Sequence, residues 1–419
     1  MSGYDPTPSL VEVDGVAMRY SASFRANVGE RWLILAVLFL ARTAMAFQFQ
    51  SVAAISPVVM NQFGVGLADI GLLISLYLAP GIAVALPGGE IGRRYGDKPV
   101  VLLGLALMIC GSLMMILKSI WPWQLAGRLL AGVGGVLLNV LMSKMIADWF
   151  AGKEIATAMA IFVNSWPVGI ALALISLPPL VSIGGATSVH FATSALAGLG
   201  LLLIATCYKA PPGRTAPAVG ATWPAGLVLR AVVVAGCIWG LYNAALGMVF
   251  GFGTAMLTER GWNLTAAGST ISLVLWLVGL SVPLGGIMAD RTGWHIAVML
   301  GGFALFAAML VIATRTEFVV LSFAALGLVS GISAGPIMSL PARVLGPDVR
   351  AAGMGVYFSV FYVMVVAGPI AAGKIASMAG TSRITFDIGA VMLVGCFVAY
   401  WTFKKLSPRQ VETRLANPS

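Results

Sequence analysis

One arginine inside a long apolar run is the residue with the clearest capacity for chemistry in this sequence. Arg42 lies about ten residues into the run 32–54, which is long enough to cross a hydrocarbon core of about 30 Å as a helix. A cation at that depth costs about 2.5–3.5 kcal/mol on insertion scales, so Arg42 is expected to face a protein interior or a water-filled cavity. The acids of the other runs fall at or near predicted helix ends: Asp69, Glu90, Asp148, Glu259, Glu317 and Asp387.

The sequence therefore offers Arg42 no carboxylate at its own depth. An uncompensated cation in a low-dielectric cavity attracts an anion, and a guanidinium suits carboxylates and oxyanions because it donates two parallel hydrogen bonds. This pattern favours an anionic small-molecule substrate with Arg42 as its main positive contact. The alternative is a structural arginine that is satisfied by backbone carbonyls and by polar neighbours such as Gln48 or Gln50.

Neutral polar and aromatic residues reach a similar depth in the other apolar runs. Hydrogen bonding between helices explains the polar ones as well as ligand contact does, and the aromatic rings could shape a pocket wall or simply pack. The residues predicted to contact the substrate besides Arg42 are Asn139, Asn164, Trp166, Asn243, Trp276, Ser333 and Tyr362.

No catalytic or metal-binding constellation is visible in the sequence. His190 and His295 lie at the ends of apolar runs, without a cysteine or an acid at ligand spacing, and the phosphate-binding pattern G-x-x-x-x-G-K-[ST] is missing. The four cysteines lie inside apolar runs and are interpreted as small packing residues. We therefore expect no enzyme activity, no cofactor and no metal, and a transport process that is driven by gradients or is purely facilitative.

The composition requires a membrane protein. Of the 419 residues, 59% are hydrophobic and 10% are charged, with a mean hydropathy of +0.96, whereas ordinary globular domains are about 25% charged. Surface-to-volume scaling forbids a soluble fold that buries so much, and outer-membrane barrels use shorter spans of alternating polarity. The sequence predicts an all-α protein in the lipid bilayer with twelve transmembrane helices, near residues 32–54, 69–88, 99–117, 123–146, 156–177, 188–208, 228–257, 265–288, 296–314, 318–341, 352–376 and 385–403.

The distribution of basic residues predicts the orientation. With a cytoplasmic N-terminus, eighteen Lys and Arg residues fall on the inner side and five on the outer side, while Arg42 and Arg128 lie within spans. This bias follows the positive-inside rule, and it explains the net charge of +10 without nucleic acid. Residues 1–30 lack the pattern of a cleavable signal peptide. We predict a multi-pass protein of the plasma (bacterial inner) membrane with both termini cytoplasmic.

The sequence repeats itself at about half its length. The segment 89–96 (GEIGRRYG) after the second span matches the segment 286–293 (GIMADRTG) after the eighth, and residues 158–160 match residues 353–355. Internal repeats of this size are typical of secondary transporters. The predicted organisation is a cytoplasmic tail (1–30), a six-helix bundle (31–208), a cytoplasmic linker rich in Pro, Gly and Ala (209–226), a second six-helix bundle (227–403) and a cytoplasmic tail (404–419).

These features resemble the major facilitator superfamily over nearly the whole chain. Its loop motif, G-x-L-A-D-R-x-G-R-R, follows the second and eighth spans. The second copy keeps the acid and the base as Asp290 and Arg291, whereas Arg93 stands where the family usually has Asp in the first copy. Glu90 or Asp97 is a candidate substitute for that missing acid.

The resemblance implies two bundles that rock about a central site, with the first, fourth, seventh and tenth spans lining the cavity. Arg42, Asn139, Asn243 and Ser333 are then the better candidates for substrate contact. Arg128 opens the family pattern R-x-x-x-G-x-G of the fourth span, which implies a structural or coupling role. The residues implied in gating or in motif structure are Gly89, Arg93, Arg94, Gly96, Arg128, Gly286, Asp290, Arg291 and Gly293.

The predicted function is that of a secondary active or facilitative transporter for a small organic or inorganic anion, acting as a monomer. Within the superfamily the sequence is similar to the cyanate-transporter-like porters of small anions. The alternative is a proton-driven exporter of hydrophobic or drug-like compounds, against which the missing mid-span acid and the missing antiporter motif of the fifth span argue. A membrane sensor on the same scaffold is a third hypothesis, which the short tails of about 30 and about 15 residues disfavour.

Overall fold

The computed structural model describes residues 28–65, 67–117, 120–151, 154–211 and 223–407. Within these ranges the regular structure is α-helical, without a β-strand. Twelve helical segments are long and apolar enough to span a membrane, which confirms the predicted fold class and the predicted number of spans. Most of the two predicted tails and most of the predicted linker lie outside the described residues, and α1 and α14 each extend a few residues into the predicted tails.

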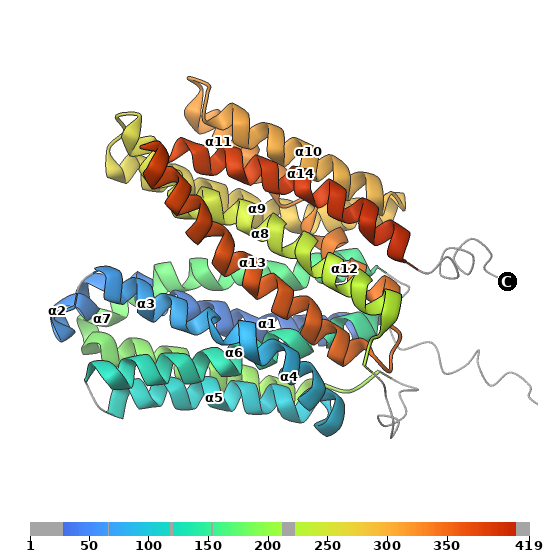
Figure 1. Cartoon of the computed structure of the whole chain (residues 1–419). Coiled ribbons are helices and arrows are strands. Elements are labelled where there is room, and N and C mark those ends of the chain that lie inside the picture. Colours follow the sequence, from blue (N-terminus) through green and yellow to red (C-terminus); the bar gives the residue numbers. More distant parts are fainter. Residues whose placement is uncertain (1–27, 66, 118–119, 152–153, 212–222, 408–419) are drawn as a thin grey trace, which may run out of the picture.

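The first half of the chain forms one bundle, the lower one in Figure 1. Its second span is interrupted between α3 and α4, where Pro80 occupies the first helical position and its missing N–H costs nothing. Its fifth and sixth spans are joined at Gly184 and Gly185, whose non-helical backbone turns the chain. The helices are α1 (Val28–Ala54), α2 (Ser56–Phe63), α3 (Leu67–Leu78), α4 (Pro80–Tyr95), α5 (Asp97–Leu117), α6 (Trp121–Phe150) and α7 (Ile155–Cys207).

The second half forms the upper bundle of Figure 1. Its tenth span is interrupted between α11 and α12, one turn before Pro336, and the two pieces together run from Val319 to Val344. Proline removes a helical hydrogen bond and clashes with the preceding turn, which explains an interruption at this place. The helices are α8 (Gly226–Glu259), α9 (Leu264–Thr292), α10 (His295–Ala313), α11 (Val319–Ser330), α12 (Ala334–Val344), α13 (Arg350–Ala379) and α14 (Arg383–Leu406).

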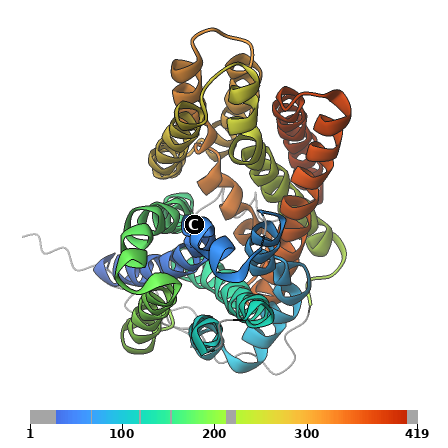
Figure 2. The same cartoon turned by 90° about the vertical axis from the view of Figure 1, so that its left-hand side faces the viewer.

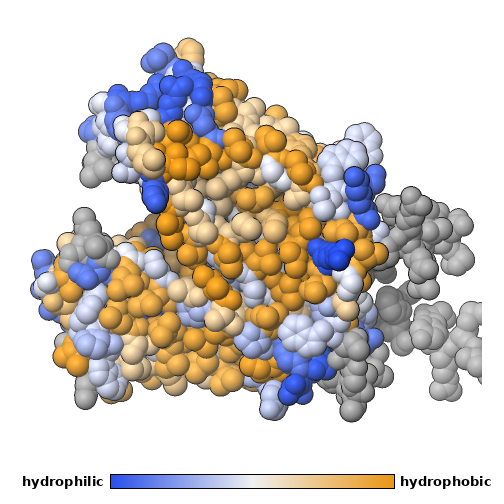
Figure 3. All heavy atoms as spheres, viewed as in Figure 1, coloured by the Kyte–Doolittle hydropathy of each residue, from blue (hydrophilic) through white to orange (hydrophobic). Residues whose placement is uncertain are grey.

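On the face seen in Figure 3, apolar side chains cover the middle of both bundles, and hydrophilic residues gather towards the two ends. Leu33, Ile175 and Val398, for example, are 57%, 64% and 65% exposed. Contiguous apolar surface of this extent is unfavourable in water, and it matches the hydrocarbon region of a bilayer. The spans therefore present their apolar faces outward to lipid and their small and polar residues to one another.

The two bundles meet in two places. Helix α4 of the first bundle packs on α13 of the second, and α7 of the first packs on α9 and α12 of the second. Figures 1 and 2 show the first of these contacts as the place where blue and red ribbons cross. The second span thus contacts the eleventh, and the fifth contacts the eighth, as expected for two related halves.

Both of these contacts depend on the glycine that opens the repeated loop motif. A Cβ atom on Gly89 would collide with the carbonyl oxygen of Ala351, and a Cβ atom on Gly286 would lie 2.7 Å from the carbonyl oxygen of Ala156. Backbone atoms cannot swing aside as a side chain can, so only glycine allows such a close approach. The sequence repeat therefore places equivalent glycines at equivalent contacts between the bundles.

The two ends of the molecule differ. We call the end that carries the α4–α5 and α9–α10 connections the closed end, because the glycine contacts lie there. We call the opposite end, which carries α2 and the α10–α11 connection, the open end. At the open end the space-filling view shows a hollow between the bundles (Figure 3), and Figure 2 looks onto it. The described chain begins and finishes at the closed end.

The substitution Gly89→Ala tests the contact between α4 and α13. The added methyl group overpacks two backbones, which costs about 1–3 kcal/mol, so we expect a lower melting temperature of the purified protein. The matched control is Gly301→Ala, because Gly301 also lies inside a helix and a Cβ there has nothing within 4 Å. Equal melting temperatures for the two variants would show that the contact does not need glycine.

Candidate substrate site

A cavity of about 270 Å³ lies between the bundles. Both halves of the chain line it, and its lining is apolar apart from a few polar groups. The first half contributes Arg42, Met45, Phe49, Leu78, Asn139, Val163, Asn164, Trp166 and Pro167. The second half contributes Trp239, Tyr242, Asn243, Leu246, Gly247, Phe250, Leu275, Val278, Val282, Ala334, Met338, Phe358, Phe361, Tyr362 and Val365.

Arg42 of α1 lies in this cavity and is only 7% exposed. Its Nε donates to Oδ1 of Asn139 at 2.9 Å. One terminal nitrogen, Nη1, lies 3.1 and 3.2 Å from the carbonyl oxygens of Phe162 and Val163 and 2.9 Å from Oγ of Ser165. The guanidinium also stacks over the ring of Phe162, at 4.7 Å from the ring centroid. These contacts to α6 and α7 fix the direction in which the guanidinium points.

All of these partners of Arg42 are neutral, so its charge is oriented but not compensated. Within the described residues the ion pairs do not include Arg42, and the hydrogen bonds of its guanidinium use Nε and Nη1 rather than Nη2. Gln48, which the sequence offered as a neighbour, instead donates to the carbonyl of Met108 and to Ser112. Carbonyls therefore hold one side of the guanidinium, while its Nη2 can donate to a ligand.

Asn139 links Arg42 to the opposite bundle. Its Nδ2 donates to the hydroxyl oxygen of Tyr362 at 3.2 Å, while its Oδ1 accepts from Arg42. Because the Tyr362 hydroxyl accepts this bond, its own proton can be donated to a ligand in the cavity. The ring of Tyr362 packs flat against Gly81, where any Cβ atom would overlap it. Two donors, one from each bundle, thus meet at the same place.

Three other predicted contact residues also line the cavity. Asn164 lies on α7, and its Oδ1 is buried without a hydrogen-bond partner in the described part of the chain. Asn243 lies on α8, where its Nδ2 donates to the carbonyl of Trp239 at 2.8 Å and leaves Oδ1 as an acceptor. The ring of Trp166 lies 5.1 Å from that of Phe49. The structure brings these residues together with Arg42, Asn139 and Tyr362.

Two predicted contact residues lie elsewhere, and both predictions require correction. Trp276 is 58% exposed and does not line the cavity, although its neighbour Leu275 does. Ser333 is 1% exposed and donates to the carbonyl of Met299, while its neighbour Ala334 lines the cavity. Each prediction was off by one residue, which turns a side chain by about 100° around a helix axis.

Most of the aromatic residues that line the cavity were not predicted from the sequence. Trp239, Phe250, Phe358 and Phe361 line the cavity but were not among the predicted contacts, and neither was Phe49. A signal for them exists, since aromatic residues of α8 and α13 recur at helical spacing and share one face with the predicted residues Asn243 and Tyr362. Such a stripe also suits ordinary helix packing, so spacing alone does not identify a cavity wall.

Arg128 of α6 is buried outside the cavity lining, at 1% exposure. It donates to the carbonyl oxygens of Leu73, Gln48 and Phe49, at 3.1 and 2.6 Å for the first two. Its guanidinium lies 4.5 Å from the ring centroid of Tyr77. Arg128 therefore ties α1, α3 and α6 together, and it holds the backbone of Phe49, whose ring lines the cavity.

The first copy of the loop motif pairs its charges within one helix. Glu90 forms ion pairs with Arg93 and with Arg94, at 2.7 Å for Arg94. Glu90 is therefore the acid that pairs with Arg93, the arginine at the position of the family's usual acid. Gly96 ends α4 with φ = +90°, a backbone conformation that L side chains rarely adopt. Asp97, the other candidate substitute, instead binds Lys144 of α6 at 2.6 Å.

The second copy of the loop motif reaches across the bundles. Oδ2 of Asp290 on α9 accepts from the backbone N–H of Thr157 in the first turn of α7 at 2.7 Å, where a carboxylate complements the helix dipole. His295 contacts the other oxygen of Asp290 at 2.8 Å. Gly293 ends α9 in the left-handed conformation, with φ = +71°. Arg291, next to Asp290, is exposed.

A different ion pair crosses the bundles where the first motif copy lacks its acid. Arg350, at the start of α13, binds Oδ1 of Asp148 on α6 at 2.5 Å. Lys144 lies 3.0 Å from Oδ2 of the same carboxylate. All three side chains are at most 8% exposed. The closed end is therefore held by Asp290 on one side and by the pair between Arg350 and Asp148 on the other.

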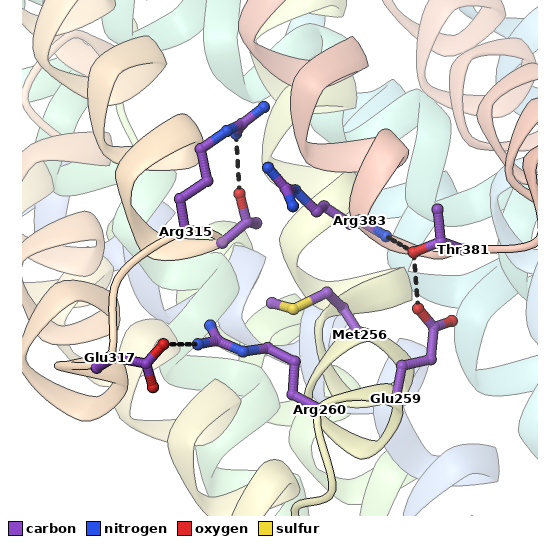
Figure 4. Close-up of a pocket in the computed structure, with 8 residues that line it drawn as sticks. Met256, Glu259, Arg260, Arg315, Glu317, Thr381 and Arg383 are labelled. Carbon is purple, nitrogen blue, oxygen red and sulfur yellow. Dashed lines mark hydrogen bonds and ion pairs between the residues drawn. The ribbon is translucent and has the colours of Figure 1, made fainter.

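A second hollow, of about 440 Å³, lies at the open end of the second bundle (Figure 4). Arg260, Arg315 and Arg383 face it, but three acids stand beside them. Arg315 binds Asp387 at 2.8 Å, and Arg260 lies 3.9 Å from Glu317. Glu259 accepts from Thr381 and from the backbone of Ser382. Because these charges balance locally, the central cavity is the stronger candidate for an anion site.

Several solved structures share this fold. The chain superposes on the Escherichia coli fucose:proton symporter with a TM-score of 0.70, at 14% identity over 90% of this chain and 100% of that one. A mutant of the transporter XylE gives a TM-score of 0.75, at 14% identity over 90% and 96% of the two chains. The human organic anion transporter MFSD10 gives 0.69, at 16% identity over 88% and 99%. At these identities the likeness concerns the fold alone.

Curated relatives match the chain over shorter segments. The human choline/ethanolamine transporter FLVCR2 is 26% identical over 154 residues, which are 36% of this chain and 29% of that protein. Probable anion transporter 7 of Oryza sativa subsp. japonica is 24% identical over 197 residues, which are 46% and 44% of the two chains. The chain thus spans less than half the length of these relatives, and their substrates are not transferred with the match.

The family comparison covers nearly the whole chain. The family model of the Major Facilitator Superfamily matches residues 38–259 and again residues 231–418. The first match covers the first bundle and extends through α8, the second match covers the second bundle, and both agree with the resemblance seen in the loop motif and the repeat. Together with the twelve spans and the superposed transporters, they establish that the chain belongs to the Major Facilitator Superfamily.

Proposed function

We propose that this membrane transporter carries a small organic or inorganic anion, with Arg42 as the main positive contact. Members of the superfamily are transporters and not enzymes, and they work by exposing a central site alternately to each side of the membrane. The observation that carries the proposal is the orientation of Arg42 in the central cavity by neutral partners alone.

The energetics of the cavity support an anion. A charge 4 Å from the guanidinium interacts with it by about 4 kcal/mol at an effective dielectric constant of 20. An anion gains this energy and relieves a desolvated cation, whereas a cation such as a quaternary ammonium is repelled by the same amount. The Tyr362 hydroxyl adds a second donor beside Asn139. Hydrogen bonds to a charged group contribute about 1.5–3 kcal/mol each.

The relatives provide support of a weaker kind. The plant proteins are named probable anion transporters, and the human structure is named an organic anion transporter. FLVCR2 is named for choline and ethanolamine, which are cations or carry an amine. The aromatic lining would suit a quaternary ammonium group, so choline is the informative competitor in any test of the anion proposal.

The aromatic lining also favours a second candidate function, the export of hydrophobic or drug-like compounds driven by protons. Rings such as Trp239, Phe250 and Phe361 offer apolar surface to such a compound. A proton-driven mechanism needs a group that titrates along the pathway, and the cavity lining contains no carboxylate among the described residues. The lining therefore favours an anion transporter over a proton-driven exporter.

We further propose that the protein lies in the plasma membrane, which is the inner membrane in bacteria, and that its closed end faces the cytoplasm. We propose that it acts there as a monomer. An even number of spans places both termini on one side. That side is the closed end, where Arg93, Arg94 and Lys98 gather on one bundle and Arg291 and Arg343 on the other. Cytoplasmic loops carry such an excess of Lys and Arg.

The substitution Arg42→Gln tests the anion site. Loss of a charged hydrogen-bond donor should weaken anion binding by about 10–100-fold and abolish anion uptake, while the variant remains folded. Binding is measured by the shift in melting temperature with a panel of anions, amines and neutral drugs, because a ligand that binds the folded protein stabilises it. A response confined to choline or to neutral drugs would contradict the proposal.

Lys374→Gln is the matched control for Arg42→Gln. Lys374 also lies within a span, yet it is exposed and does not line the cavity. Its variant should bind and transport anions like the unmodified protein. If Arg42→Gln behaves as Lys374→Gln does, the guanidinium does not hold the substrate.

The substitution Asp148→Asn tests alternating access at the closed end. Removing one partner of a buried ion pair costs about 3–5 kcal/mol, so the conformation with a sealed closed end should lose population. The bundles can be followed by spin labels on Tyr95→Cys and Trp294→Cys, two residues of the closed end that are each 71% exposed and lie on different bundles. We expect longer label distances in the variant.

The control for this experiment is Glu317→Gln at the open end, where the side chain is 95% exposed and its contact with Arg260 is loose. Both measurements use a background in which the four native cysteines are replaced. Unchanged label distances in Asp148→Asn would mean that the pair with Arg350 does not hold the closed end.

A further inference from the structure

The lining of the central cavity limits the shape of the substrate as well as its charge, because each bundle contributes a pair of aromatic rings to it. Phe49 and Trp166 from the first bundle lie 5.1 Å apart with an interplanar angle of 37°. From the second bundle, Trp239 stacks on Phe361 at 6.0 Å and 26°. All four rings line the cavity, and we call them the ring walls.

The ring walls are unsuited to a small inorganic anion. Such an ion is strongly hydrated, and the cavity replaces little of that hydration, since its lining is mostly apolar and offers few hydrogen-bond donors besides Arg42 and Tyr362. Burying a charge against apolar walls without compensating hydrogen bonds is costly. An occupant that fits must present a polar head to the guanidinium and an apolar body to the rings.

The charge and the volume limit this occupant further. Arg42 is one cation, so it compensates one negative charge, and a dianion would keep a second charge in an apolar cavity. The cavity volume of about 270 Å³ is just below the usual range for ligand pockets, about 300–1,000 Å³. The body of the occupant is therefore about one ring, and flat rings pack best against the faces or edges of aromatic walls.

We propose that the substrate of this site is an aromatic monocarboxylate of about one ring. Its carboxylate accepts hydrogen bonds from Nη2 of Arg42 and from the hydroxyl of Tyr362, and its ring lies between the ring walls. This inference rests on the proposed anion transport and narrows it to a substrate class. It adds a specificity role for Phe49, Trp166, Trp239 and Phe361.

A set of four probes tests the inference with the purified full chain. Benzoate has the head and the flat ring, cyclohexanecarboxylate has the head and a bulky saturated ring, acetate has the head alone, and benzamide has the ring with a neutral head. Dissociation constants are obtained from the shift in melting temperature and from quenching of tryptophan fluorescence. We expect benzoate to bind most tightly, cyclohexanecarboxylate more weakly, and acetate and benzamide at least tenfold more weakly than benzoate.

The variant Phe361→Leu separates the ring walls from the charge. An aromatic pair contributes about 0.5–1.5 kcal/mol beyond its buried area, so benzoate should bind about 2–12-fold more weakly. Cyclohexanecarboxylate should be little affected. The ratio of the two constants is measured on one preparation, so loss of folded protein cancels. Phe318→Leu is the matched control, since Phe318 is 75% exposed outside the cavity.

The outcomes distinguish this inference from the anion proposal. If benzoate, cyclohexanecarboxylate and acetate bind equally, or if Phe361→Leu leaves the ratio unchanged, the anion site stands and the aromatic substrate class is wrong. If benzamide binds as tightly as benzoate, the guanidinium is not the head contact and the anion proposal fails. If none of the carboxylates binds while choline does, both proposals are overturned.

Discussion

A positive charge that is held in place without being neutralised is the constraint on which this structure depends. Carbonyls and an amide oxygen satisfy one face of the Arg42 guanidinium, and because they are neutral they leave its charge intact. Arg128 shows the contrasting case, since three carbonyls and the ring of Tyr77 surround it away from the cavity. One buried arginine thus ties helices of the scaffold together, while the other lines the central cavity.

The scaffold that positions Arg42 is built from two halves that are similar in sequence and that also make similar contacts with each other. Gly89 and Gly286 open the two copies of one motif, and both bring a helix against the backbone of the other bundle. Their neighbours have diverged. Asp290 accepts from the first turn of α7 across the interface, whereas Arg93 binds Glu90 on its own helix. The ion pair that crosses the interface on that side joins Asp148 and Arg350.

Much of the fold could be predicted from sequence, because length and hydropathy determine what can cross a bilayer. The site was predicted less evenly. Arg42 stood out because a cation in an apolar run is rare, whereas Trp276 and Ser333 were each misplaced by one position, since helical phase cannot be read where every face is apolar. The ion pair between Asp148 and Arg350 joins residues 202 positions apart in the chain, so no local sequence pattern predicts it.

The contact between Gly81 and Tyr362 has a consequence for the width of the cavity. Gly81 belongs to one bundle and the ring of Tyr362 to the other, and the two touch without room for a single methyl group. The width of the cavity at its polar end is therefore not a property of either bundle. This width is set by the spacing between the two bundles. A rocking motion of the bundles therefore changes the size of the cavity and, with it, which molecules fit inside.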